Sequence, residues 1–298
     1  MTSVPHEKPP PRVRPGRRLS TFFYSHPHAG LAALLALPIG WLLIGYLGSL
    51  FVLLLASMWS TDPFTSEVVH HYTVDNFRRI IEEPVYRDVA WRTIKMAAFV
   101  TVADAVLAFP IAYYMARVAS PRTRNLLVVA VLMPLWASYL VKAYAWRTIL
   151  SGAGVINWAL DPFGLSFDGY STAGLWLVFT YLWLPFMILP IYAGLERIPQ
   201  SLLEASADLG GRSVRTFFRV TLPLAFPAVV AGSIFTFSLT LGDYIAPKLI
   251  TSQQFIGTVI YDQRGTNLPV AAAFTLVPIG VMIVYLLVAK RLKAFEAL

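Results

Sequence analysis

The chain is 298 residues long, and 57% of its residues are hydrophobic while only 13% are charged. Soluble domains contain about 25% charged residues, so this composition excludes an ordinary soluble protein and indicates a membrane protein. The chain has no cysteine, which excludes disulfides and thiolate metal sites, and its net charge of +8 requires no nucleic-acid partner.

Residues 1–28 are predicted to form a disordered basic tail followed by a short segment at the membrane interface. The first 18 residues contain five prolines and five basic residues, a composition that does not support a packed core. The next segment would bring Phe22, Phe23 and Tyr24 to the lipid headgroups. Residues 29–298 are expected to form one transmembrane domain of six helices.

Six apolar stretches are long enough to cross a membrane, whose hydrocarbon core of about 30 Å requires about 20 helical residues. None of them alternates between apolar and polar residues, which favours helices over a barrel of strands. Each stretch contains a proline, which is typical of helices that bend. The sequence therefore predicts an all-α polytopic membrane protein. Its predicted spans are Leu31–Met58, Trp91–Ala116, Asn125–Trp146, Thr172–Leu195, Leu222–Leu241 and Leu268–Ala289.

Charge predicts the orientation of these spans. With six spans, the N-terminal tail, the second and fourth loops and the C-terminal tail share one side of the membrane. That side carries about twice as many Lys and Arg residues as the other, so the positive-inside rule places both termini and the fourth loop in the cytoplasm. The acidic loop Ser60–Ala90 would then lie on the periplasmic face.

Ionisable residues inside the spans are candidates for function, because a charge at the membrane centre costs about 3 kcal/mol unless it is solvated or paired. Asp104, in the second span, has three interpretations: a hydrogen-bonded structural carboxylate, a lining of a translocation path, or a proton relay. Lys95, Lys142 and Asp243 are expected near the periplasmic ends of their spans. They could pair with one another or face an outer gate, and Lys142 could also snorkel to the interface.

Aromatic residues flank Lys142 and Asp243 in the sequence. Rings near the ends of spans usually anchor a helix in the interface. They could instead complete a site for a cationic group, because the faces of aromatic rings attract cations. The candidate residues for a translocation path are therefore Asp104, Lys142, Tyr144, Trp146, Asp243 and Tyr244.

The fourth loop, at about residues 196–222, is polar and is predicted to form a helical hairpin. Ser201 and Glu204 fit the S-x-x-E pattern of a capping box, which predicts that the first helix of the hairpin begins at Leu202. The simplest role of Glu204 would then be that of a helix cap.

Gly210 and Gly211 are predicted to end this first helix, because glycine adopts the left-handed conformation at little cost. A second short helix is predicted from about Ser213 to Pro223, where the next span begins. The basic residues of this second half could contact either a partner protein or lipid phosphates. They are Arg212, Arg215 and Arg219.

The hairpin resembles the EAA loop in the permeases of binding-protein-dependent ABC importers. The pattern of that loop is E-A-x-x-x-x-G, nine residues, an aliphatic residue, one further residue, and L-P. Ser206 replaces the second alanine of the family pattern. The other positions are filled by Glu204, Ala205, Gly210, Val220, Leu222 and Pro223.

Two further segments resemble the spermidine/putrescine-type branch of this family. Pro134–Trp146 fits P-x-W-x-S-x-L-V-[RK]-x-Y-A-W, and Gly242–Pro247 fits G-D-[YF]-x-x-P. The chain departs from the branch at Ser252–Gln254, where many members have a pair of glycines.

The family resemblance implies a type I ABC importer permease fold in the bacterial inner membrane, and a transport subunit rather than an enzyme. It implies a second permease, identical or different, two cytoplasmic ATPases, and a periplasmic or lipid-anchored solute-binding protein. ATP and Mg²⁺ would be bound by the ATPases, because this sequence has no G-x-x-x-x-G-K-[ST] loop. The chain itself is expected to hold no cofactor and no metal. The residues expected to couple it to the ATPase are Glu204, Ala205, Ser206, Asp208, Gly210, Arg212 and Arg215.

The branch resemblance implies a polyamine such as spermidine or putrescine as the solute, with amino-acid-like or opine solutes as alternatives. A rival from another class is an ion-coupled secondary transporter that uses Asp104 as its ion site. The absence of an internal repeat and the presence of the docking pattern argue against it. A membrane enzyme is disfavoured because the sequence has no His-rich or carboxylate cluster.

Overall fold

The computed structural model describes residues 27–62, 65 and 67–291. The chain divides into two compact units, with the division after Leu55. Most of the predicted basic tail lies outside the described residues. Its last two residues, Pro27 and His28, form the beginning of the first described helix.

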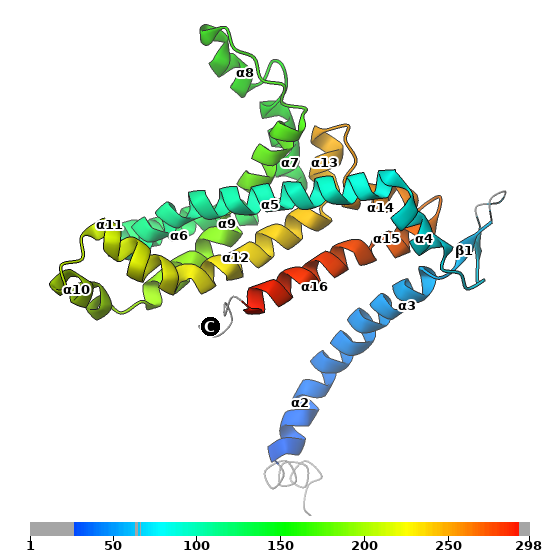
Figure 1. The fold of residues 1–298 in the computed structure, drawn as a ribbon, viewed down its shortest axis with the longest axis horizontal. Helices are drawn as coiled ribbons and strands as arrows, with labels where there is room; N and C mark the ends of the chain where they lie inside the picture. Colours follow the sequence, from blue (N-terminus) through cyan, green and yellow to red (C-terminus); the bar gives the residue numbers. More distant parts are fainter. Residues whose placement is uncertain (1–26, 63–64, 66, 292–298) are drawn as a thin grey trace, which may run out of the picture. The chain divides into compact units, whose positions relative to one another are not determined.

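The described part of the first unit, from Pro27 onward, is one run of helix, drawn in blue in Figure 1. It comprises α2 (Pro27–Trp41), a π-helical turn η1 (Leu42–Leu47) and α3 (Gly48–Ala56), whose last residue follows the division. Its apolar side chains are largely exposed, and Leu37 is 83% and Trp41 81% accessible. A helix that is apolar on all sides is expected to be surrounded by lipid or protein. The segment Leu34–Ala56 is long enough to cross a membrane.

The second unit begins with a small antiparallel hairpin of two strands and continues as helices (Figure 1). β1 (Ser60–Thr61) pairs with β2 (Val68–Val69) in the register Ser60 to Val69 and Thr61 to Val68. The helices that follow are α4 (Asp75–Glu82), α5 (Pro84–Tyr113), η2 (Tyr114–Val118), α6 (Pro121–Trp136), α7 (Tyr139–Ile149), α8 (Val155–Leu160), η3 (Asp161–Phe163), α9 (Thr172–Arg197), α10 (Gln200–Asp208), α11 (Ser213–Thr216), η4 (Phe217–Thr221), α12 (Leu222–Gly242), α13 (Ile245–Ile250), α14 (Ile256–Gln263), α15 (Leu268–Phe274) and α16 (Leu276–Arg291).

Three long helices, α5, α9 and α12, lie side by side at the centre of the second unit (Figure 1). Small residues bring α9 and α12 close together. A Cβ atom on Gly194 would lie 2.3 Å from the Cβ of Ala228, and one on Gly232 would lie 3.2 Å from the Cα of Met187. Helices in membranes commonly pack through small residues, because lipid supplies no hydrophobic drive to hold larger side chains together.

Five of the six predicted spans are confirmed as helices long and apolar enough to cross a membrane among the described residues. These helices are Leu34–Ala56, Pro84–Val118, Thr172–Arg197, Ser213–Gly242 and Leu268–Arg291.

The third predicted span, Asn125–Trp146, is wrong as a single helix. It consists of α6 and α7, which meet at 93°. The helix ends shortly after Pro134, and the next residues, Ala137 and Ser138, are extended with ψ values of 140° and 136°. Pro134 weakens the turn of α6 that precedes it, but the helix continues to Trp136, so the bend itself is made by the two non-helical residues Ala137 and Ser138.

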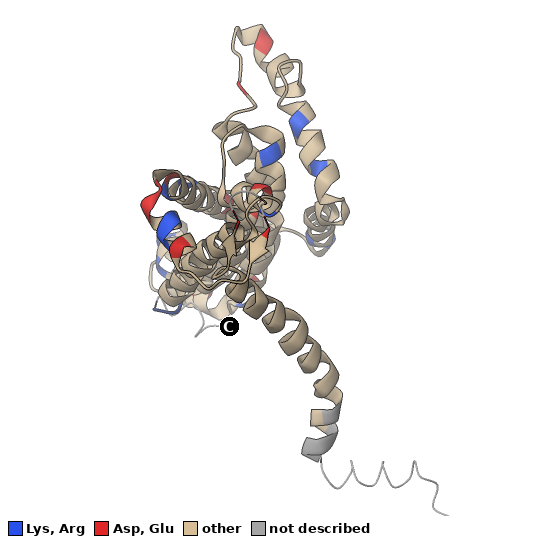
Figure 2. Ribbon diagram, turned by 90° about the vertical axis from the view of Figure 1, so that its right-hand side faces the viewer, with Lys and Arg blue, Asp and Glu red and all other residues tan. Residues whose placement is uncertain are grey.

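Most of the ribbon in Figure 2 is tan, because few residues of the long helices are charged, and the charged residues of α9 and α16 lie in their last turns. This distribution is expected for membrane spans, because a charged side chain in hydrocarbon is costly. Asp104 departs from it. It lies in the interior of α5 and is completely buried.

Candidate functional site

The hairpin consists of α10, the turn Leu209–Arg212, α11 and η4. Gly210 ends α10 in the left-handed conformation, with φ at 76°. Its N–H donates to the carbonyl of Ala207, and the N–H of Gly211 donates to the carbonyl of Ser206, each at 2.9 Å. This pair of bonds is a Schellman motif, which satisfies the last carbonyls of a helix and favours glycine. The predicted glycine stop is therefore confirmed.

The predicted start of the same helix is wrong. α10 begins at Gln200 with Pro199 as its N-cap residue, and no side chain caps it. Ser201 and Glu204 therefore form no capping box, and both are exposed. The boundary is instead set by Pro199, because a proline disfavours the helical conformation in the residue before it. That residue, Ile198, is extended with ψ at 119°.

The second half of the hairpin begins at Ser213, which confirms its predicted start, but it does not end at Pro223. It is no separate short helix, because α11, η4 and α12 form one helical run from Ser213 to Gly242. The run widens into the π-helical turn η4 just before Pro223. Proline cannot donate to the carbonyl four residues earlier, that of Arg219, and the wider turn lies where this bond is missing.

The two halves of the hairpin are joined by a hydrogen bond between the hydroxyls of Ser206 and Thr216, whose oxygens are 2.9 Å apart. They also approach closely at Gly211, where a Cβ atom would lie 2.5 Å from the carbonyl oxygen of Ser206. Ser206, which replaces an alanine of the family pattern, therefore braces the hairpin. Thr216 was missed in the sequence because its partner lies ten residues away across a turn.

The outer surface of the hairpin combines charge with an apolar tip. Leu209 is 90% exposed, which is the highest value for a large apolar side chain in the described part of the chain. A single exposed leucine is common on protein surfaces, so it is the position of Leu209 at the turn of the hairpin that makes it a candidate contact for another protein. Sequence reasoning missed it because a single leucine in a polar loop has no periodic signal. Around it, the exposed residues predicted to couple to the ATPase are Glu204, Ala205, Asp208, Arg212 and Arg215.

Asp104 is enclosed by the helices of the second unit. Its exposed fraction is 0%, and neither carboxylate oxygen has a hydrogen-bond partner among the described residues. One turn earlier in α5, the hydroxyl of Thr101 accepts a bond of 3.4 Å from the hydroxyl of Thr236 in α12. Asp104 thus lies in a polar part of the helix interface, and no hydrogen bond or ion pair joins it to another predicted path residue in the part of the chain that is described.

Asp243 caps the short helix α13. Its Oδ1 accepts bonds from the backbone N–H groups of Ile245 at 2.7 Å and Ala246 at 3.1 Å. Its Oδ2 accepts a hydrogen bond from the hydroxyl of Tyr139, the first residue of α7. Tyr139 in turn stacks on Trp183 of α9, with ring centroids 6.0 Å apart. Asp243 therefore connects the break between α6 and α7 to the corner between α12 and α13.

Tyr244 lies beside a second group of rings and charges. Its ring stacks on Tyr261 with centroids 4.6 Å apart. The Lys248 Nζ and the Arg264 guanidinium carbon lie 4.1 Å and 4.0 Å from the centroid of Tyr261. Lys248 also forms an ion pair with Asp262. Tyr261 thus already has two cations of this chain against it, which sequence reasoning did not foresee.

The three candidate residues of α7 do not gather at one point. Lys142 is half-buried and Tyr144 is exposed, while Trp146 packs against Tyr181 of α9 with ring centroids 5.3 Å apart. One alternative, an ion pair of Lys95 or Lys142 with Asp243, is not found among the described residues. Lys95 lies instead over the ring of Trp91, at 5.3 Å from its centroid.

Comparisons with known proteins agree with this geometry. Residues 108–295 match the family described as the binding-protein-dependent transport system inner membrane component. Over 304 residues, the chain is 49% identical to the inner membrane ABC transporter permease protein YdcU of Escherichia coli K12, with 96% of this chain and 97% of YdcU covered. It is 29% identical over 229 residues to the spermidine/putrescine transport system permease protein PotB of the same organism, with 74% of this chain and 82% of PotB covered.

A solved structure has the same fold. It is a bacterial alginate ABC transporter in complex with an alginate pentasaccharide-bound periplasmic protein. Its matching chain has a TM-score of 0.72 and 18% identity, with 94% of this chain and 98% of that chain covered. The predicted type I ABC importer permease fold is thereby confirmed. The chain belongs to the binding-protein-dependent transport system inner membrane component family and is a multi-pass permease subunit of an ABC importer in the inner membrane.

Proposed function

We propose that this permease imports a polyamine such as spermidine or putrescine. The observation that carries this proposal is the 29% identity with a permease named for spermidine and putrescine, which extends over 74% of the chain. Two segments that fit the pattern of that branch, Pro134–Trp146 and Gly242–Pro247, support it. The alginate transporter is only 18% identical, so its similarity supports the fold and not the solute.

We further propose that the chain works with a second permease, two cytoplasmic ATPases and a solute-binding protein. The hairpin supports the ATPase partner, because its rigid turn presents Leu209 and several charged residues to solvent. The sequence has no phosphate-binding loop of its own, so ATP and Mg²⁺ belong to the ATPase chains, and this chain requires no cofactor. Both termini and the hairpin then face the cytoplasm, as the distribution of Lys and Arg predicts.

Import in such a complex follows from movement of the hairpin. Closure of the two ATPases on ATP draws the hairpins of the two permeases together, and the helices attached to them swing from an inward-opening to an outward-opening arrangement. The solute-binding protein then releases its solute into the cavity between the permeases. This chain forms part of the wall of that cavity and breaks no covalent bond.

An ammonium group of the solute needs carboxylates or ring faces along its path. The residues proposed to supply them are Asp104, Asp243, Tyr244, Tyr144 and Trp146, with Lys142 nearby. The carboxylate oxygens of Asp104 have no partner among the described residues, but its exposed fraction is 0%, so a solute would reach it only if the helices around it move apart. Asp243 already accepts three hydrogen bonds within this chain, so a solute would have to compete for it.

Uptake by the whole reconstituted complex tests the solute. Proteoliposomes that contain both permeases, the ATPases and ATP, with the binding protein outside, are given radiolabelled putrescine or spermidine. We expect saturable uptake that requires ATP, and the binding protein should bind the same solute in calorimetry. Uptake of an amino acid or an opine in place of either amine would overturn the polyamine assignment while leaving the importer class intact.

A second candidate function is ion-coupled secondary transport, which the unpartnered carboxylate of Asp104 favours as an ion site. Vanadate, which inhibits ABC ATPases, separates the two functions. We expect vanadate to abolish uptake in proteoliposomes. Uptake that is resistant to vanadate and that collapses with the ion gradient would instead support the secondary transporter.

A further inference from the structure

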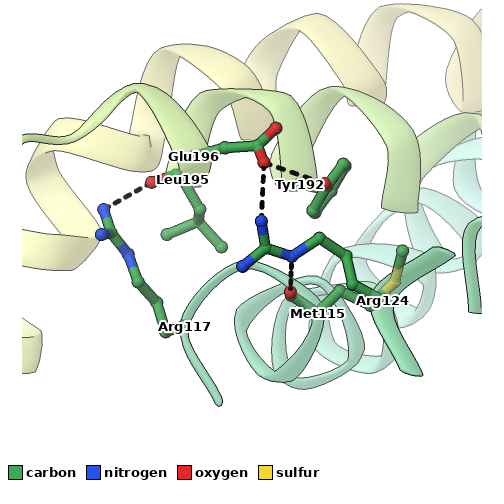
Figure 3. A network of polar contacts seen from close by, with 6 residues as sticks. All are labelled: Met115, Arg117, Arg124, Tyr192, Leu195 and Glu196. Carbon is green, nitrogen blue, oxygen red and sulfur yellow. Dashed lines mark hydrogen bonds and ion pairs between the residues drawn. The ribbon is translucent and has the colours of Figure 1, made fainter. Parts of the chain in front are cut away.

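We infer that Arg117 and Arg124 form the joint that transmits movement of the hairpin to α5 and α6. The inference rests on the proposed docking of an ATPase at the hairpin, and it adds the residues through which the resulting force reaches the membrane. Figure 3 shows both arginines reaching from η2 and α6 to the last turn of α9, directly before the hairpin.

Arg117 fastens the end of α9. Its Nη2 donates to the carbonyl of Leu195 at 2.5 Å and to that of Ile198 at 2.7 Å. The last carbonyls of a helix have no partner within the helix, and a cation is favoured at that end. Both accepting residues are buried. Only Ile198 and Pro199 separate α9 from α10, so the guanidinium holds the chain where it enters the hairpin.

Arg124 adds a second attachment to the same turn of α9. Its Nη1 lies 3.2 Å from Oε1 of Glu196, which also accepts a bond of 3.1 Å from the hydroxyl of Tyr192. The Nε of Arg124 donates to the carbonyl of Met115 in η2 at 3.1 Å. One guanidinium therefore bridges η2, α6 and α9, and Figure 3 shows the three elements meeting around it.

The other half of the hairpin has a different kind of attachment to α5. Phe217 of η4 packs edge-on against Phe109 and Tyr113, with ring centroids 5.4 Å and 6.1 Å apart. Aromatic pairs are favourable in both offset and edge-to-face arrangements over several ångströms of separation, whereas hydrogen bonds to a helix end weaken steeply when they are misaligned. Residues of η2 and α6 also share an apolar cluster with α9, and the two arginines add the directional contacts through which movement that enters through α10 is passed to η2 and α6.

The exposure of the Arg124–Glu196 ion pair indicates that this pair contributes little to the stability of the fold. The side chains of Arg124 and Glu196 are 31% and 48% exposed, and exposed ion pairs contribute little to folding. The pair instead holds α6 and α9 in a fixed relative geometry. Arg117 is half-buried, and its Nε has no partner among the described residues, so its bonds to α9 are its main attachment.

The experiment compares Arg117→Met, Arg124→Gln and their double variant in the complete transporter in proteoliposomes. The measured quantity is solute taken up per ATP hydrolysed, together with co-purification of the ATPase and the melting temperature of the complex. Arg122→Gln is the matched control, because Arg122 is an exposed arginine in the first turn of α6 with no partner among the described residues.

We expect the double variant to keep its ATPase and to hydrolyse ATP while its uptake per ATP falls at least about fivefold, the lower end of measured couplings between distant sites. Arg117→Lys keeps the charge but loses the planar fork of the guanidinium, so its uptake per ATP should lie between that of the wild type and that of Arg117→Met. Unchanged uptake per ATP in the double variant would overturn the proposal that the two arginines transmit movement of the hairpin. Loss of the ATPase from the complex would also overturn it, because the arginines would then serve docking.

A distance measurement gives a readout that a merely structural role would not move. The sequence has no cysteine, so spin labels on Ser201→Cys and Asn125→Cys report one distance between α10 and α6. In the wild type we expect this distance to stay narrow with and without ATP and vanadate, and to broaden in Arg117→Met at unchanged melting temperature. An equally narrow distribution of this distance in the wild type and in Arg117→Met would overturn the proposal that Arg117 transmits movement of the hairpin. Failure of the proposed function is recognised separately, because the wild-type complex would then show no ATP-dependent uptake.

Discussion

The hydroxyl of Tyr139 donates a hydrogen bond to the carboxylate of Asp243, and the two residues are 104 positions apart in the chain. Tyr139 starts α7 directly after the break in the third span, and Asp243 caps α13 directly after α12. The bond therefore fixes two interruptions of membrane helices against each other. Such interruptions expose backbone groups that have to be satisfied by protein, because lipid cannot satisfy them.

Tyr139→Phe tests this connection. The substitution keeps the ring against Trp183 but leaves Oδ2 of Asp243 without its donor. Asp243 is half-buried, so the cost should be about 1 kcal/mol, the lower end of the range for an unsatisfied buried acceptor. We expect a lower melting temperature of the purified complex. Tyr144→Phe is the control for stability, because that tyrosine lies on the same helix and is 55% exposed. Equal melting temperatures of the two variants would show that the bond does not stabilise the break.

Substitution of Gly210 tests the turn of the hairpin. An alanine there would be held at φ of 76°, which costs an L-residue about 1–2 kcal/mol. A proline would also lose the N–H that donates to Ala207. We expect Gly210→Pro to insert into the membrane normally but to lose uptake, because α10 is re-aimed against the ATPase.

The measurement is ATPase activity stimulated by the binding protein, in reconstituted complex. Gly152→Ala is the control, since a Cβ atom at Gly152 would meet nothing within 4 Å. Normal stimulated activity in Gly210→Pro would count against a docking role of the hairpin, whatever its effect on uptake.

Asp104→Asn tests the buried carboxylate. The amide has almost the same shape but cannot carry a charge, and a buried carboxylate without a partner is unfavourable for folding. We therefore expect the melting temperature of the complex to stay the same or to rise, while uptake of a cationic solute falls. Parallel losses of stability and uptake would instead assign Asp104 a structural role. A variant unchanged in both respects would exclude both roles.

Much of the fold is predictable from this sequence because the membrane imposes a simple rule on it. An apolar run of sufficient length has to be a helix, and five spans follow from that rule. The turn at Gly210 is also local, since the preference of glycine for the left-handed conformation is intrinsic to the residue.

The failed predictions involve competition between local signals or contacts between distant residues. Ser201 and Glu204 have the spacing of a capping box, but α10 already begins at Gln200, directly after Pro199, so Ser201 is not the N-cap residue. Pro134 was expected to kink a continuous helix, whereas the two extended residues after it turn the chain by 93°. The hydrogen bonds of Arg117 join residues about 80 positions apart in the sequence, and no pattern within one segment predicts them.

Leu209 provides the most direct test of the hairpin as a docking element. Its side chain is 90% exposed, so Leu209→Ser should leave the stability of the permease unchanged. Fewer than about 30% of interface residues cost more than about 1 kcal/mol on truncation, and those residues lie near the centre of the interface. If the apolar tip of the hairpin is such a central contact, loss of this side chain should weaken binding of the ATPase at least about fivefold. Binding is measured by titrating the ATPase onto the permease in nanodiscs. Phe163→Ser is the control, because Phe163 is 76% exposed in the connection between α7 and α9, at the other end of the spans. Equal affinity of the two variants would mean that the apolar tip of the hairpin does not contact the ATPase.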